Sequence, residues 1–247
     1  MPTKFSKVFF KFFLIFFLFV SSNACVSTIS SQYLKNDFMS ATGIVIIFPL
    51  VKVEEPGLCT AVAFAKNGKK YQFFTAAHCA ADYDKETSKT ILKNATYSII
   101  LEKQNGAKLI KGAIVLAVGE MKNFEDFAIL EAEIDEDIPI MPLSKFGYEL
   151  DEDIRVVTAP VGPEVGLLYL RGYVSKEKIN EMIMFNSIKT EGAFGVQVNG
   201  LGKALGSSGA GVFSVKQNAI IGEVVGFTFN VNGHATILVI PITKFND

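Results

Sequence analysis

Phe73-Phe74-Thr75-Ala76-Ala77-His78-Cys79 is the segment that decides the fold, because it places one of the chain's two histidines at the end of an apolar strand pattern. Neutral imidazole is the side chain best suited to take up a proton near pH 7, so His78 is a candidate general base. A lone histidine is more often structural than catalytic. The interpretation therefore depends on what the rest of the chain supplies.

A second segment, Gly206-Ser207-Ser208-Gly209-Ala210-Gly211, places Ser208 among glycines. Glycine permits the sharp backbone turn that exposes a nucleophilic hydroxyl and lets N–H groups converge beside it. A flexible Gly/Ser turn of the kind found in any β protein is the alternative explanation. Ser208 is thus a candidate nucleophile whose standing depends on a matching base.

A histidine that acts as a base needs a buried carboxylate to hold its ring in the right tautomer. The candidates lie between these two segments, in Asn123-Phe124-Glu125-Asp126-Phe127-Ala128-Ile129-Leu130. Phe127 and Ile129 alternate along a predicted strand, which puts Asp126 and Ala128 on the opposite face. Glu125 is the rival carboxylate, and a solvated charge at a strand end is the alternative for both. Asp126 is the preferred candidate.

Together the three segments resemble the motifs of trypsin-like serine peptidases, and the order His78, Asp126, Ser208 is the chymotrypsin-like one. The resemblance implies that Ser208 is the nucleophile, His78 the base and Asp126 the group that orients the imidazole. It also implies an oxyanion hole formed by the N–H groups of Gly206 and Ser208. The resemblance extends over the whole chain from about residue 40 onward. Outside the three motifs it is only a similarity in sequence pattern.

An all-β fold is predicted, because short runs rich in Val, Ile, Phe and Ala alternate with turn signals such as Asn67-Gly68 and Asn105-Gly106. The strands expected first span residues 41–53, 60–65, 71–75, 97–101, 113–118 and 127–131. Those expected later span residues 154–159, 167–174, 182–185, 194–198, 211–215, 220–229 and 235–240.

The two sets contain about six strands each, which predicts two tandem six-stranded antiparallel Greek-key β-barrels, since closure removes exposed strand edges. An acidic, proline-containing stretch at residues 135–153 marks the midpoint, so we expect an N-terminal barrel at 41–145 and a C-terminal barrel at 146–247. With His78 and Asp126 on one barrel and Ser208 on the other, the resemblance places the active site in the cleft between them.

Cys59 and Cys79 lie where the trypsin-like family has the disulfide beside its histidine, so the resemblance implies that they are bonded. Closing a loop of about 20 residues would stabilise the fold by about 3 kcal/mol. Two buried free thiols are the alternative. A zinc site is a weaker one, because adjacent His78 and Cys79 lack the usual ligand spacing.

Residues 1–24 read as an export signal, with three lysines, an apolar run at 12–20 and small residues at the end. The apolar run is too short for a membrane-spanning helix, the alternative explanation. Cys25 follows the predicted cut, where bacterial lipoproteins carry their lipidated cysteine, although Ser22 departs from the usual lipobox. Residues 25–40 are expected to be a tether. Both the lipid-anchored and the freely secreted form would be extracytoplasmic.

The sequence says little about substrate specificity. By the resemblance, substrate should lie near Gly202 and along Val225, Gly226 and Phe227, and no acidic residue occupies the position of the pocket base. A preference for Lys or Arg is therefore not indicated. His234 is a candidate for the pocket wall, with a surface histidine beside the Asn232-Gly233 turn as the alternative. Ser207 replaces the aspartate that vertebrate-type zymogens use on activation, so no activation cut of that type is expected.

The predicted function is that of a serine endopeptidase acting on polypeptides without metal or cofactor. A net charge of −1 with no Lys/Arg run longer than a pair argues against nucleic acid as a partner. We expect a monomer, which would associate with a membrane only in the lipid-anchored alternative, through Cys25. An inactive trypsin-fold protein that binds peptides is the alternative from another class, and an esterase is a further one.

Overall fold

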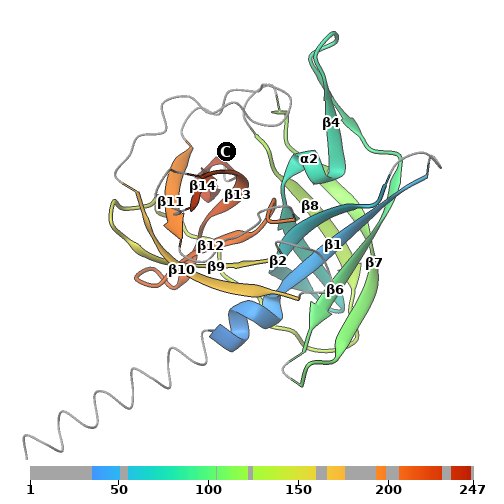
Figure 1. The fold of residues 1–247 in the computed structure, drawn as a ribbon. Helices are drawn as coiled ribbons and strands as arrows, with labels where there is room; N and C mark the ends of the chain where they lie inside the picture. The colour runs from blue at the N-terminus through green and yellow to red at the C-terminus, as the bar shows by residue number, and fades with distance from the viewer. Residues whose placement is uncertain are drawn as a thin grey trace, which may run out of the picture. The chain divides into compact units, whose positions relative to one another are not determined.

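The computed structural model describes residues 35–50, 55–103, 105–121, 125–159, 166–175, 193–198, 206–229 and 235–245. These residues form two closed antiparallel β-barrels (Figure 1). The predicted all-β architecture of two six-stranded barrels is thereby confirmed.

Six strands close the N-terminal barrel in the order β1-β2-β3-β8-β7-β6. Their bounds are β1 Thr42–Pro49, β2 Gly57–Asn67, β3 Lys70–Thr75, β6 Ala95–Glu102, β7 Lys108–Val118 and β8 Ala128–Glu133. β-Branched and aromatic side chains dominate these segments and suit a pleated, half-buried surface. The turns expected at Asn67-Gly68 and Asn105-Gly106 are present, with positive φ angles at Gly68 (61°) and Gly106 (79°).

Six further strands close the C-terminal barrel in the order β10-β11-β14-β13-β12-β9. Their bounds are β9 Asp153–Thr158, β10 Leu168–Val174, β11 Phe194–Val198, β12 Gly211–Ser214, β13 Ala219–Phe229 and β14 Ala235–Pro241. Val, Ile and Leu side chains from all six strands fill the barrel interior. A 3₁₀ turn, Ile242–Phe245, follows the last strand.

Both barrels connect their strands in the same way. If each set is numbered from one to six along the chain, both close in the order 1-2-3-6-5-4. The first three strands form a meander, and the last three return in reverse to close the ring, which is the predicted Greek-key arrangement. The barrels are thus two copies of one topology without any evident repeat in sequence.

A two-stranded hairpin outside both barrels was not predicted from the sequence. Strand β4 (Ala81–Asp84) pairs with β5 (Lys89–Leu92), immediately after the short helix α2 (Ala77–Ala80) (Figure 1). Exposed Ile91 and Leu92 and the absence of strict alternation explain why the pattern gave no strand signal here.

The segment between the barrels, residues 134–152, is held against both of them. On the N-terminal side, the Met141 N–H donates to the Ala63 carbonyl at 2.8 Å. On the C-terminal side, the Ile220 N–H donates to the Pro142 carbonyl, and the Ser144 N–H donates to the Ile220 carbonyl, each at 2.8 Å. This connection therefore bridges the barrels along its length.

Residues 35–41 are helical and lead directly into β1. Phe38 is fully buried and packs on Phe213 of β12, with ring centroids 5.4 Å apart. The chain just before the N-terminal barrel therefore contacts the C-terminal one. Over the part of the chain that is described, no helix has the length and apolarity to cross a membrane.

Several predictions concern residues outside the described ranges. These are the export signal at 1–24, Cys25, most of the tether, the strand at 182–185, Gly202 and His234.

The predicted disulfide is confirmed, since Cys59 of β2 is bonded to Cys79 of α2. It closes a loop across 20 residues of sequence and ties α2 to the barrel wall. Replacing both cysteines by alanine should lower the free energy of unfolding by about 3 kcal/mol, because the unfolded chain regains the freedom of that loop.

Urea unfolding of the Cys59→Ala/Cys79→Ala double variant measures this loss. Reduction of the wild-type protein by dithiothreitol before unfolding is the matched control and should give a loss of similar size. A variant as stable as the oxidised protein would contradict the assignment of a stabilising role to this bond.

Candidate active site

His78 is presented by the end of β3 and the single turn of α2. Ala76 and Ala77 are fully buried, so the backbone turns closely against the barrel at this point. Cys79 is held by its disulfide, and its N–H donates to the Ala76 carbonyl at 3.0 Å. Small buried residues on one side and a covalent bond on the other fix the backbone of His78, whose side chain remains 25% exposed.

Asp126 lies directly against His78. One carboxylate oxygen, Oδ2, is 2.8 Å from His78 Nδ1, and the other, Oδ1, accepts the His78 backbone N–H at 2.9 Å. Asp126 is only 5% exposed. A buried carboxylate that binds both the ring and the backbone of one histidine fixes the orientation of that ring, leaving Nε2 as the atom available for proton transfer.

The rival carboxylate, Glu125, has a different environment. Its Oε2 accepts the backbone N–H of Glu120 at 2.9 Å, in a solvent-exposed hydrogen bond. The alternation inferred from Phe127 and Ile129 therefore matches the observed placement, in which Asp126 and Ala128 are buried and Glu125 is not at the histidine.

The turn that carries Ser208 is held by two glycines with positive φ, Gly206 at 91° and Gly209 at 83°. A Cβ atom on Gly209 would lie 2.1 Å from the Thr60 carbonyl oxygen, 2.2 Å from Thr75 Oγ1 and 2.9 Å from the Ala76 nitrogen. Glycine is therefore required at 209 both by conformation and by space. This contact brings the residue after Ser208 against the residues that precede His78.

Ser208 is half-buried, and its carbonyl accepts the Thr60 N–H at 2.8 Å. Within the described residues, no hydrogen bond joins its hydroxyl to the His78 ring. Hydrogen bonds between nucleophile and base are commonly long in unliganded enzymes and tighten with substrate. The structure thus brings all three predicted residues to one place and joins two of them by hydrogen bonds.

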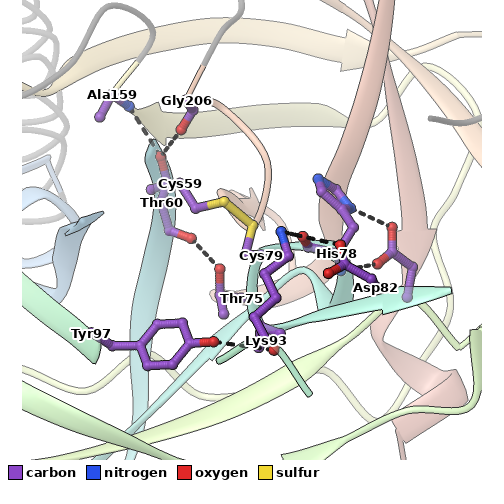
Figure 2. Close-up of a disulfide and its surroundings, with 12 residues drawn as sticks. Cys59, Thr60, Thr75, His78, Cys79, Asp82, Lys93, Tyr97, Ala159 and Gly206 are labelled. Carbon is purple, nitrogen blue, oxygen red and sulfur yellow. Dashed lines mark hydrogen bonds and ion pairs between the residues drawn. A yellow bond between two sulfur atoms is a disulfide. The ribbon is translucent and has the colours of Figure 1, made fainter. Parts of the chain in front are cut away.

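Thr60 connects the two barrels at this place (Figure 2), a role that no sequence pattern predicted. Its hydroxyl donates to the Gly206 carbonyl at 2.7 Å and accepts the Ala159 N–H at 3.1 Å, both in the C-terminal part of the chain. Its carbonyl accepts the Thr75 hydroxyl at 2.7 Å. Every polar atom of this fully buried residue is therefore engaged.

The oxyanion hole predicted from the sequence would use the N–H groups of Gly206 and Ser208. Among the residues that the structure describes, neither the Gly206 N–H nor the Ser208 N–H donates a hydrogen bond. The Ser207 carbonyl between them is occupied, because it accepts the Ala210 N–H at 3.0 Å. The Ser208 N–H belongs to this fixed peptide, and together with the Gly206 N–H it can bind one oxygen anion.

The predicted substrate-binding strand is part of β13. Pairing with β14 is irregular between Val224 and Gly226, so Val225 is the extra residue of a bulge. Phe227 pairs with Ile237 beyond it. Val224 links this strand to the serine turn, since its carbonyl accepts the Gly209 N–H at 2.7 Å.

Two further residues at the site escaped the sequence reasoning. Lys93 donates to the His78 carbonyl at 2.8 Å, and nothing in its local pattern marks it (Figure 2). Glu223 lies fully buried within β13, and its charge type in an otherwise apolar strand was a signal that could have been noticed. Burial raises the pKa of Glu223 well above its usual range, and the Asp126 carboxylate adds to this effect.

Comparison with known proteins gives agreement in structure without agreement in sequence. No family model matches the chain, and no curated protein is significantly similar to it in sequence. Among solved structures, the active form of the Rv3671c protease from M. tuberculosis has a TM-score of 0.62 at 13% identity, covering 86% of this chain and 81% of that one.

Two others give the same result. The thermostable serine protease AL20 from an extremophilic microorganism has a TM-score of 0.59 at 14% identity, with 82% of this chain and 91% of that one covered. Deg5 has a TM-score of 0.57 at 16% identity, with 87% and 90% covered. At such identities the likeness establishes a shared fold.

The contacts of Thr60 predict a large effect from a small change. Thr60→Val keeps the shape but leaves the half-buried Gly206 carbonyl and the buried Ala159 N–H without their partner, which should lower the free energy of unfolding by about 2–4 kcal/mol. Thr60→Ser keeps the hydroxyl and should lose only about 1 kcal/mol for the missing methyl group. Chemical unfolding of both variants measures the difference, and equal losses would refute the bridging role.

Proposed function

We propose that this chain, which has the two-barrel fold of the trypsin-like serine proteases, is a serine endopeptidase that acts through Ser208, His78 and Asp126. The contact of the buried Asp126 carboxylate with both the ring and the backbone of His78 carries the proposal. The Ser208 turn packed against Thr75 and Ala76 supports it, as do the free amides of Gly206 and Ser208.

The chemistry is acyl transfer. Ser208 Oγ attacks the scissile carbonyl while His78 Nε2 takes its proton, and the developing oxyanion is bound by the Gly206 and Ser208 N–H groups. The protonated imidazole is stabilised by Asp126 and then gives its proton to the leaving amine. Water, activated by the same histidine, releases the acyl group and restores the serine.

The substrate we propose is a polypeptide bound along Val225, Gly226 and Phe227, beside the serine turn. The bulge at Val225 supports this assignment, because bulges redirect a strand next to active sites. The Cys59–Cys79 disulfide is in keeping with an oxidising compartment, so we also propose that the enzyme acts outside the cytoplasm.

A non-catalytic peptide-binding protein of the same fold is the second candidate. Such a protein would not need unengaged amides beside a serine, nor a carboxylate buried against a histidine at the desolvation cost that such burial carries. These two features favour the enzyme over the binding protein.

Labelling by a fluorophosphonate probe tests the nucleophile. Wild-type protein should be labelled once, and Ser208→Ala should lose all labelling because the attacking oxygen is removed. Ser207→Ala is the matched control: its buried hydroxyl has no hydrogen-bond partner among the described residues, so labelling should persist. Labelling that survives in Ser208→Ala, or that is lost only in Ser207→Ala, would overturn the assignment.

The role of Asp126 is tested by turnover of a peptide substrate. Asp126→Asn should lower kcat by about four orders of magnitude, because an amide favours the wrong imidazole tautomer and cannot stabilise the imidazolium. Glu125→Gln, one residue away and hydrogen-bonded only at the surface, should keep wild-type turnover. Equal effects of the two substitutions would exclude Asp126 as the orienting carboxylate.

A further inference from the structure

Glu223 is a buried carboxyl for which the proposed mechanism has no use. It is 0% exposed, and neither of its oxygens has a hydrogen-bond partner among the described residues. Native proteins rarely leave a buried polar group unpaired, because the cost of its lost hydration is then not offset. A buried carboxyl at this position therefore needs a hydrogen-bond partner, and its presence needs an explanation.

Strand register places Glu223 at the junction of the barrels. It lies opposite Gly211 of β12 and opposite Ile240 of β14. Gly211 in turn packs on the N-terminal barrel, since a Cβ atom there would be 3.0 Å from Val62 and 3.2 Å from Phe74. The surroundings contributed by these strands are thus apolar.

Glu223 precedes Val224, whose carbonyl accepts the Gly209 N–H at 2.7 Å, and Gly209 packs against Thr75 and Ala76 just before His78. His78 binds Asp126, and the Asp126 charge adds to burial in raising the pKa of Glu223. Two carboxylates close together in a buried site cannot both be ionised without a large cost, so one of them holds a proton. Asp126 accepts two hydrogen bonds from His78. Glu223 has no such donor among the described residues, so Glu223 is the protonated one.

The two carboxyl groups are complementary in hydrogen bonding. An ionised carboxylate has about four acceptor positions. Both hydrogen bonds seen for Asp126 within the described part of the chain come from His78, and its 5% exposure limits access by solvent. A protonated Glu223 has one O–H donor to give and no other acceptor identified in its apolar surroundings.

We propose that Glu223 is a positioning residue, which stays uncharged and supports Asp126 from the C-terminal barrel by donating a hydrogen bond to it through one enclosed water. This proposal rests on the proposed function. It makes the orientation of His78 depend on both barrels, because β13 then supplies the group that holds Asp126 in place behind the imidazole.

Two substitutions separate positioning from simple packing. Glu223→Gln keeps size, neutrality and an N–H donor, so kcat should stay near the wild-type value. Glu223→Leu removes the donor, so kcat should fall about tenfold or more with little change in KM, as expected for the loss of one hydrogen bond to a charged group. A wild-type kcat in the leucine variant, or an equal loss in both variants, would overturn the proposal.

The pH dependence of stability tests the uncharged state without reference to activity. The folded protein holds the Glu223 proton more tightly than the unfolded chain does. This proton therefore stabilises wild type at pH values below the usual pKa of a glutamate. The stabilisation is lost as pH rises toward the raised pKa. Between the usual pKa of a glutamate and the raised pKa of Glu223, the unfolding constant of wild type relative to Glu223→Gln should therefore grow about tenfold per pH unit.

Glu152→Gln is the matched control for this measurement. Glu152 is also buried in the C-terminal part of the chain, but it accepts hydrogen bonds from Ser214 and Gln217. Its replacement should lower stability at neutral pH, where Glu223→Gln should raise it. A wild-type to Glu223→Gln ratio that does not change with pH refutes the uncharged carboxyl even if no substrate is ever cleaved. If stability depends on pH as expected but the probe does not label the protein, only the proposed function is refuted.

Discussion

The site depends on the hydrogen bonds of one buried threonine. Thr60 belongs to the N-terminal barrel, yet its hydroxyl and its N–H bind Gly206, Ala159 and Ser208. The same residue accepts the Thr75 hydroxyl three residues before His78. His78 and Ser208 lie on different barrels, so their spacing is set by the contacts that join the barrels, and Thr60 supplies three hydrogen bonds of this kind.

Electrostatics at this junction follow from the same arrangement. Burial makes each unpaired charge costly, and the structure places one histidine and two carboxyl groups where the barrels meet. Asp126 accepts two hydrogen bonds from His78, which offset the cost of burying its carboxylate, whereas Glu223 has no such donor among the described residues and is proposed to be uncharged. In the proposed mechanism, a single net negative charge behind the imidazole stabilises the proton that His78 takes up.

Local motifs predicted much of this arrangement because they encode local requirements. The Thr75–Cys79 segment must turn tightly, and Gly209 must fit where no Cβ atom can. Alternation around Phe127 buries Asp126. Each of these requirements leaves a local pattern in the sequence, so each could be predicted from it. Thr60 and Lys93 were not found, because their importance lies in partners distant in sequence. Glu223 did carry a local signal, a charged residue within an apolar strand, but that signal does not say what the residue contacts. The hairpin β4–β5 was missed for a different reason, namely its exposed and irregular side-chain pattern.

A crystal structure of the protein after reaction with a fluorophosphonate tests the central claim most directly. The account predicts phosphorus bonded to Ser208 Oγ, its free oxygen within hydrogen-bond distance of the Gly206 and Ser208 nitrogens, and His78 Nε2 beside the adduct with Asp126 still bound to Nδ1. An adduct on another residue, or one on Ser208 with His78 turned away and the two amides unused, would contradict it.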